Sequence, residues 1–237
     1  MFYKTLFIYL NELIINRCFM KTIKLAIITI LLFVLSCFNL QAQNWDFEFE
    51  KKEIKVWTRK LDWSKIKECK GETIMKTNLG SIISVFDDVP NFPKWVYNCS
   101  EAKRLRKDSD TRGVIYCVIK LPWPAKNRSM TFQYLLTQDK NTKEVTIRFL
   151  STKDRIPEDG NIRMTYFKSH YILTPISPNE VKVVFQSHAD PAGDLPQSII
   201  NMFLNDTPYK TLLNIRNIVE NPSFKKKYLD HVEELSK

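Results

Sequence analysis

The chain has 237 residues, of which 44% are hydrophobic and 12% aromatic, and its formal net charge is +10. This length and apolar content fit one domain with a sizeable core, and they argue against two large domains or a disordered main body. The basic charge favours contact with anionic lipid surfaces or nucleic acid, or it simply solvates the surface.

A leader is predicted before the folded domain. Residues 25–38 form an apolar run behind two lysines, shorter than the roughly 20 residues that a membrane-spanning helix needs. The run is followed by Leu-Gln-Ala ending at Ala42, which resembles the end of a signal peptide, and Met20 is a better start than Met1 because a charged segment follows it. We therefore expect a leader over 1–42 and one exported domain, periplasmic or secreted, over 43–237.

Two other interpretations of the leader stay open. The segment Val34-Leu35-Ser36-Cys37 loosely resembles a lipoprotein box, in which Cys37 would carry a lipid anchor. The apolar run could also remain as an uncleaved anchor, although it is short for that role. Export by any of these routes makes nucleic acid an unexpected partner.

The domain itself contains three cysteines, Cys69, Cys99 and Cys117. Their number is odd and their spacing is unlike that of a metal site, so we expect buried free thiols instead of a disulfide framework. Oxidation of one pair in an oxidising compartment remains an alternative.

The pattern from Trp45 onward predicts strands and then a long helix. Residues 54–59 alternate apolar and polar side chains, as is typical of a half-buried strand, and residues 68–76 indicate a second strand. A short helix follows over 81–88, with Ser81 as its cap. Short turn-like links between the next strands imply an antiparallel meander. These further strands are predicted over 113–120, 130–138, 144–151, 162–173 and 180–188.

The last part of the chain changes to a helical period. Apolar residues at helical spacing predict a helix over about 197–220. Pro208 within it predicts a kink or a split, and residues 224–235 indicate a further short, charged helix. A curved antiparallel sheet closed by a long C-terminal helix is an α+β architecture, and a cavity can form between the two.

Two stretches add a specific resemblance to this pattern. Residues 121–124 read Leu-Pro-Trp-Pro and lead to Arg128 at the start of a strand, and residues 190–196 read Asp-Pro-Ala-Gly-Asp-Leu-Pro before the long helix. With a weaker segment at 160–163, they resemble the START (steroidogenic acute regulatory protein-related lipid transfer) domain family over about 45–220. The resemblance implies a helix-grip fold, with the curved antiparallel sheet closed by the long C-terminal helix around a hydrophobic cavity, and it implies lipid binding.

The residues of these stretches have structural roles that follow from their chemistry. Two prolines hold Trp123 out as an amphipathic plate, a proline and a glycine shape a tight turn, and Asp194 is placed to cap the helix. A proline in the first helical turn is tolerated because its missing N–H would be unpaired there. The residues given these structural roles are Trp123, Arg128, Asp190, Pro191, Gly193 and Pro196.

The sequence departs from the family pattern in several places. Ser129 stands where the family has Asp, and Ala192 replaces the first glycine of the turn. Tyr134 stands where the resemblance places the arginine of a charged pair in sterol-carrying members. The cavity therefore is expected to lack charges at those places, with Tyr134 or Tyr166 as hydroxyls that could meet a ligand.

Alternation along the strands and helical spacing select the cavity wall, although the same side chains would also fill an ordinary core. The expected wall residues are Tyr116, Val118, Phe132, Tyr134, Leu136, Met164, Tyr166, Phe185, Ile199, Met202 and Phe203.

We expect a non-catalytic protein that binds, and could transfer, a lipid or other hydrophobic molecule. It should act as a monomer without cofactor or metal, with transient contact to an anionic membrane surface as a further expectation. One alternative is a cyclase-type or hydrolase-type enzyme on the same scaffold, for which His188 beside Asp190 is the one acid–base candidate. The other is an interaction module with a filled core.

Overall fold

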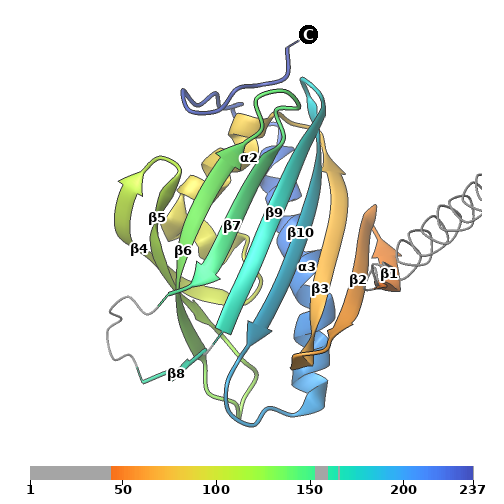
Figure 1. The fold of residues 1–237 in the computed structure, drawn as a ribbon, viewed down its shortest axis with the longest axis vertical. Coiled ribbons are helices and arrows are strands. Elements are labelled where there is room, and N and C mark those ends of the chain that lie inside the picture. The colour runs from red at the N-terminus through yellow and green to blue at the C-terminus, as the bar shows by residue number, and fades with distance from the viewer. Residues whose placement is uncertain (1–43, 153–159, 165, 237) are drawn as a thin grey trace, which may run out of the picture. The chain divides into compact units, whose positions relative to one another are not determined.

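One large, mainly antiparallel sheet and two α-helices make up most of the described part of the chain (Figure 1). The computed structural model describes residues 44–152, 160–164 and 166–236, and the predicted leader over 1–42, with Cys37, lies outside the described residues. The strands are β1 (Asp46–Lys51), β2 (Ile54–Leu61), β3 (Ser64–Met75), β4 (Cys99–Ser109), β5 (Arg112–Ile119), β6 (Arg128–Gln138), β7 (Val145–Ser151), β8 (Ile162–Arg163), β9 (Tyr166–Ser177) and β10 (Glu180–Asp190). The helices are α2 (Leu79–Asp87), the 3-10 helix η1 (Val89–Lys94) and α3 (Gln197–Val219).

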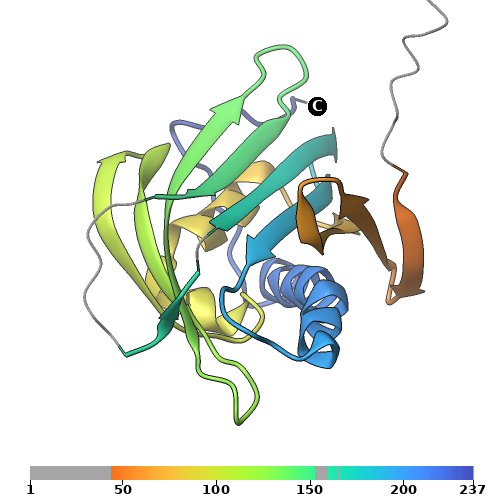
Figure 2. The ribbon, with the colours of Figure 1, turned by 60° about the horizontal axis from the view of Figure 1, so that its bottom comes forward.

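The strand order within the sheet is β1-β2-β3-β10-β9-β7-β6-β5-β4, with β8 beside β6. Strands β4 to β7, β9 and β10 form the expected meander, but β3 pairs antiparallel with β10 instead of with β4. The segment α2–η1 therefore carries the chain from β3 to β4 at the far edge of the sheet. Figure 2 shows the sheet curving around α2 and α3, which confirms the predicted α+β architecture of a curved sheet closed by a C-terminal helix.

The pattern missed the two edge strands, β1 and β4. Along β4 the sequence is Cys-Ser-Glu-Ala-Lys-Arg-Leu-Arg-Lys-Asp-Ser, and most of its second half is exposed. An edge strand with charges on successive residues lacks the alternation by which a half-buried strand is recognised, and such charges also block edge-to-edge pairing. The predicted strand over 162–173 is divided between β8 and β9.

Helix α3 is one continuous helix, so of the two outcomes predicted at Pro208, a kink or a split, the split does not occur. Pro208 is buried and faces β3 at Gly71, where an added Cβ would lie 2.9 Å from the Pro208 Cβ and 2.8 Å from the Leu212 Cδ1. Only glycine allows the helix to approach the sheet so closely. No helix in the described ranges has the length and apolar character needed to cross a membrane.

Helix α2 begins two residues before the predicted start and is capped from a distant part of the chain. The Ser81 Oγ donates to the Asn78 Oδ1 at 2.5 Å and does not cap the helix. Instead the Glu234 carboxylate accepts the backbone N–H groups of Leu79 at 3.0 Å and Gly80 at 2.8 Å. A carboxylate at this end satisfies free amide donors and complements the helix dipole.

The tail after α3 does not form the predicted helix over 224–235. Its polar groups bind α2 and the residues before it: the Lys227 N–H donates to the Ser81 Oγ at 3.0 Å, and the Lys227 carbonyl accepts from the Asn78 Nδ2 at 2.8 Å. These backbone bonds to another element replace the bonds that a helix would make internally.

Candidate functional site

The inner face of the sheet, η1 and α3 enclose an apolar cavity of about 170 Å³. Strands β3, β5, β6, β7, β9 and β10 contribute to the wall, and one face of α3 covers it. The apolar lining residues are Ile66, Phe92, Trp95, Val96, Ile119, Leu121, Met130, Phe132, Phe149, Met164, Phe167, Phe185, Ala189, Pro191, Leu195, Ile199, Ile200, Phe203 and Leu204. The polar lining residues are Lys67, Cys69, Tyr97, Cys117, Arg128, Ser169, Tyr171, Ser187, Thr207 and Thr211.

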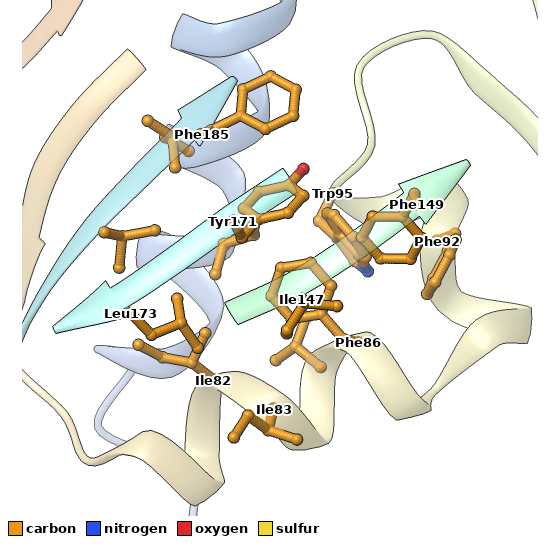
Figure 3. Close-up of a cluster of buried hydrophobic side chains, with 14 of the residues drawn as sticks. Ile82, Ile83, Phe86, Phe92, Trp95, Ile147, Phe149, Tyr171, Leu173 and Phe185 are labelled. Carbon is orange, nitrogen blue, oxygen red and sulfur yellow. The ribbon is translucent and has the colours of Figure 1, made fainter. Parts of the chain in front are cut away.

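Aromatic rings close the cavity at the end next to α2 (Figure 3). Trp95, directly after η1, packs edge-to-face against Phe86 and Phe92 with ring centroids 4.9 and 4.7 Å apart. Tyr171 of β9 stacks on Phe185 of β10 with centroids 4.6 Å apart. Apolar side chains of α2 fill the space beyond these rings, so the cavity stops there.

Two neutral polar groups stand at this aromatic end. Among the described residues, neither the buried Trp95 Nε1 nor the Tyr171 hydroxyl has a hydrogen-bond partner. Burial raises the pKa of Tyr171 well above its ordinary value, so the hydroxyl stays protonated at neutral pH. The Tyr171 hydroxyl can therefore donate to or accept from an uncharged polar atom of a ligand.

The cysteines of the domain are buried and free, and two of them, Cys69 and Cys117, lie in the cavity wall. The Cys69 thiol donates to the Ser187 carbonyl oxygen at 3.5 Å, and burial raises its pKa to about 12. Burial also raises the pKa of Cys117 well above its ordinary value. Both sulfurs are thus protonated thiols that act as apolar wall atoms and not as nucleophiles.

Two loops close the opposite end of the cavity, which we call the loop end. One is the segment between β5 and β6 that contains Trp123, and the other is the turn between β10 and α3. The Arg128 guanidinium joins them, because it donates to the carbonyl oxygens of Lys126 at 2.5 Å, Pro191 at 2.7 Å and Ala192 at 3.0 Å. Trp123, in the first of these loops, is 92% exposed.

The turn between β10 and α3 has the structure that its residues suggest, with one exception. The Asp190 Oδ1 accepts from the Ala192 N–H at 2.9 Å, and Gly193 has a positive φ of 67° that suits glycine. Pro196 is the N-cap residue, directly before the first helical residue of α3. No side chain in the described part of the chain caps this helix, so Asp194 does not have the predicted capping role.

Five residues of the predicted wall line the cavity, and six lie elsewhere. Phe132, Met164, Phe185, Ile199 and Phe203 are in the wall. Tyr116, Val118, Tyr134, Leu136, Tyr166 and Met202 are not.

The strand residues outside the wall either point to the other face of the sheet or lie beyond the end of the cavity. In β5 the cavity residues are Cys117 and Ile119, so Tyr116 and Val118 point to the other face of the sheet. Both faces of β5 are apolar and buried, and alternation therefore could not select between them. Leu136 shares a face with Phe132, but it packs in the core beyond the cavity.

The two tyrosines predicted as cavity hydroxyls also have other surroundings. The Tyr134 hydroxyl accepts from the Arg104 Nη1 at 2.6 Å, outside the cavity wall. Tyr166 contacts the Trp63 ring on the other face of the sheet, with centroids 5.6 Å apart. Strand β8 ends at Arg163 and β9 begins at Tyr166, so alternation counted from one strand into the next selects the other face.

Helix α3 contributes more of its surface to the wall than predicted, including Ile200 and Leu204. The cavity residues Ile199, Phe203, Thr207 and Thr211 recur every four positions, and Met202 lies beside this stripe. The pattern did not select Tyr171, because alternation was counted from Met164 and therefore selected the even-numbered residues of the strand. Counting alternation back from the turn after β9 would have selected it.

His188 and Asp190 do not form an acid–base pair in the cavity. The His188 Nε2 is hydrogen-bonded to the Ser64 Oγ at 2.9 Å, and its ring stacks on Trp63 at 4.7 Å. Its neighbours Ser187 and Ala189 face the cavity, so the His188 ring lies on the other face of β10. Within the described residues, no three His, Cys, Asp or Glu side chains gather into a metal site.

Comparisons with known proteins agree with this fold. A family model described as START domain matches residues 35–222. An uncharacterized protein from Pseudomonas aeruginosa is 28% identical over 184 residues, which is 77% of this chain and 90% of that protein. A STAR-related lipid transfer protein fragment from Xanthomonas axonopodis is 26% identical with a TM-score of 0.68, and the match covers 75% of this chain and 99% of that chain. Human StAR-related lipid transfer protein 5 has the same fold, with 18% identity, a TM-score of 0.66, and coverage of 79% and 91%.

Proposed function

The chain belongs to the START domain family, and from this premise we propose that it is a non-catalytic carrier that holds one lipid or other hydrophobic molecule under α3. The apolar cavity between the sheet and α3 is the observation that carries the proposal. A hydrocarbon ligand would be stabilised there by roughly 0.8 kcal/mol for each CH₂ group removed from water. The Xanthomonas relative is described as a lipid transfer protein, which also supports transfer as the role.

The chemistry of the wall supports binding without catalysis. Among the described lining residues there is no aspartate, glutamate or histidine side chain that could act as a general acid or base. The thiols of Cys69 and Cys117 are protonated, and the Tyr97 hydroxyl donates to the Asp206 carboxylate at 3.0 Å. Such a wall can hold a ligand and orient it, and it offers no activated group for bond cleavage.

Uptake of a whole lipid requires the cavity to widen. Ligand pockets commonly have volumes of roughly 300–1,000 Å³, and this cavity has about 170 Å³. We place the movement in residues 197–207 of α3, because Pro208 cannot donate the helical bond to the Leu204 carbonyl and leaves a weak point there. The loop end, with Trp123 beside it, is then the entrance. Slower amide exchange over 197–207 after lipid binding would support this opening.

Export is a separate part of the proposal and rests on the predicted leader. The protein would work as a monomer in the periplasm or outside the cell, or on a membrane if Cys37 carries a lipid anchor. Cell fractionation of the wild type and of Cys37→Ala separates these cases. A protein that stays in the cytoplasm in both forms would contradict export.

The carrier proposal is tested by native mass spectrometry of the protein purified from its own host without detergent, followed by organic extraction. A lipid bound in a one-to-one ratio would support the carrier role and give the ligand class. A protein without bound lipid that also takes up no phospholipid, fatty acid or sterol would contradict it. The filled-core module or an enzyme with a small substrate would then be favoured.

A further inference from the structure

Arg128 is a buried cation in the wall of a mainly apolar cavity. It opens β6, is 3% exposed, and lines the cavity at the loop end. No carboxylate within the described residues forms an ion pair with it. The other cation of the wall, Lys67, differs in this respect, because its Nζ lies 3.5 Å from the Asp46 carboxylate and 3.8 Å from that of Glu48.

The guanidinium of Arg128 has more N–H donors than the hydrogen bonds to the two loops use. Arginine has five N–H groups, and three of them donate to the backbone carbonyl oxygens of Lys126, Pro191 and Ala192. These bonds fix the plane of the guanidinium and leave one N–H on each terminal nitrogen. Two such N–H groups can meet two oxygens of one oxyanion.

The charge of Arg128 also favours an anion. Three carbonyl dipoles offset part of the cost of burying the guanidinium, but none of them neutralises the charge. An anionic oxygen at the cavity side would complete both the hydrogen bonding and the charge balance. The aromatic end, by contrast, offers only the neutral groups of Trp95 and Tyr171, so a charged group is bound more favourably at the loop end.

We infer that the cavity selects an amphiphile with an anionic head, a carboxylate or a phosphate monoester, which binds the two remaining N–H groups of Arg128 while its hydrocarbon chain lies against the wall toward Trp95. This inference rests on the proposed carrier function and adds the ligand class and its orientation. The specificity comes from Arg128, and the affinity for the chain comes from the apolar wall.

The test compares matched single-chain ligands by calorimetry or by displacement of a fluorescent lipid. Lauric acid and lauryl phosphate carry the anionic head, and lauryl alcohol has the same chain without charge. Charge-assisted hydrogen bonds contribute roughly 1.5–3 kcal/mol, so the wild type should bind the two anionic ligands about tenfold or more tightly than the alcohol. This comparison needs no variant and stands even if substitution of Arg128 prevents folding.

Two variants then locate the effect. Arg128→Gln should remove the preference, so that this variant binds the two anionic ligands no more tightly than it binds lauryl alcohol. Arg112→Gln, which removes an exposed arginine from the start of β5, should leave the preference intact. Acetate and inorganic phosphate, as heads without a chain, should bind far more weakly than the amphiphiles.

Each contrary result has a distinct meaning. Equal affinity of the wild type for acid and alcohol overturns the inference and leaves the carrier function standing. Failure of all three amphiphiles to bind overturns the inference, and the carrier function is then decided by the mass spectrometry described above. Acetate or phosphate that binds as tightly as the amphiphiles would show a site for free anions and overturn the assignment to a lipid head.

Discussion

The Nε of Arg128 donates to the carbonyl oxygen of Pro191 at 2.7 Å, so the residue that opens β6 holds the turn that leads into α3. The same guanidinium holds its own loop through the Lys126 carbonyl. The two loops at one end of the cavity are therefore joined by a single side chain.

Arg128→Lys should lower the free energy of unfolding by about 2 kcal/mol or more. A lysine keeps the charge, but its shorter and differently shaped head cannot reach all three carbonyl oxygens, and hydrogen bonds to charged groups contribute roughly 1.5–3 kcal/mol each. Urea denaturation measures the change, with exposed Arg112→Lys as the control that should alter stability by less than about 0.5 kcal/mol. Equal stability of Arg128→Lys and wild type would contradict this role.

Gly71→Ala should destabilise the protein by about 1–3 kcal/mol, because the added methyl group would overlap Leu212 and Pro208 of α3. The same measurement on Leu212→Ala tests the cause. In that background Gly71→Ala should cost less, since one of the two obstructing side chains is gone. A full, additive cost in the double variant would show that the helix approach is not responsible.

Ser169→Leu should reduce lipid binding with little effect on the fold. Ser169 is buried and faces the cavity, so a leucine there would occupy space that the ligand needs. Lys168→Leu is the matched control, because Lys168 is the neighbour of Ser169 on β9 and is exposed on the other face of the sheet. Fluorescent-lipid titration should show weakened binding for Ser169→Leu only, and equal binding by both variants would place the ligand elsewhere.

Trp123→Ser should weaken association with membranes and leave the lipid affinity unchanged. Trp123 is 92% exposed beside the proposed entrance, and Lys120 and Lys126 in the same loop are also exposed. An aromatic plate next to cations suits the interface of an anionic bilayer. Sedimentation with phosphatidylglycerol vesicles should show reduced binding, with phosphatidylcholine vesicles as the neutral comparison. Unchanged sedimentation of the variant would rule out this contact.

Stability should fall as the pH is lowered below about 6.5, the ordinary pKa of histidine. Burial lowers the pKa of His188 and of His170 in the folded protein. Between those lowered values and 6.5 the unfolded chain binds more protons than the folded one, so acid favours unfolding. Replacing both histidines by glutamine should flatten the decrease of the unfolding free energy between about pH 7 and pH 5. A double variant with the wild-type slope would assign the effect to other groups.

The sequence by itself determined the elements with strong periodicity and the loops with distinctive chemistry. The span of α3 was predicted to within one residue at each end, because its apolar side chains follow the 3.6-residue repeat of a helix. β6 and β10 were found for the same reason, with the period of two. The Pro-Trp-Pro loop and the turn before α3 identified the family, because prolines and glycine restrict the backbone locally.

The tertiary structure decided which face of each strand meets the cavity and which distant groups satisfy one another. Both faces of β5 are apolar, so only the curvature of the sheet distinguishes Cys117 from Tyr116. The Glu234 carboxylate at the start of α2 and the Arg128 guanidinium on Pro191 join residues far apart in the chain. Local patterns depend on neighbours along the chain, whereas these contacts depend on where the folded chain brings its polar groups together.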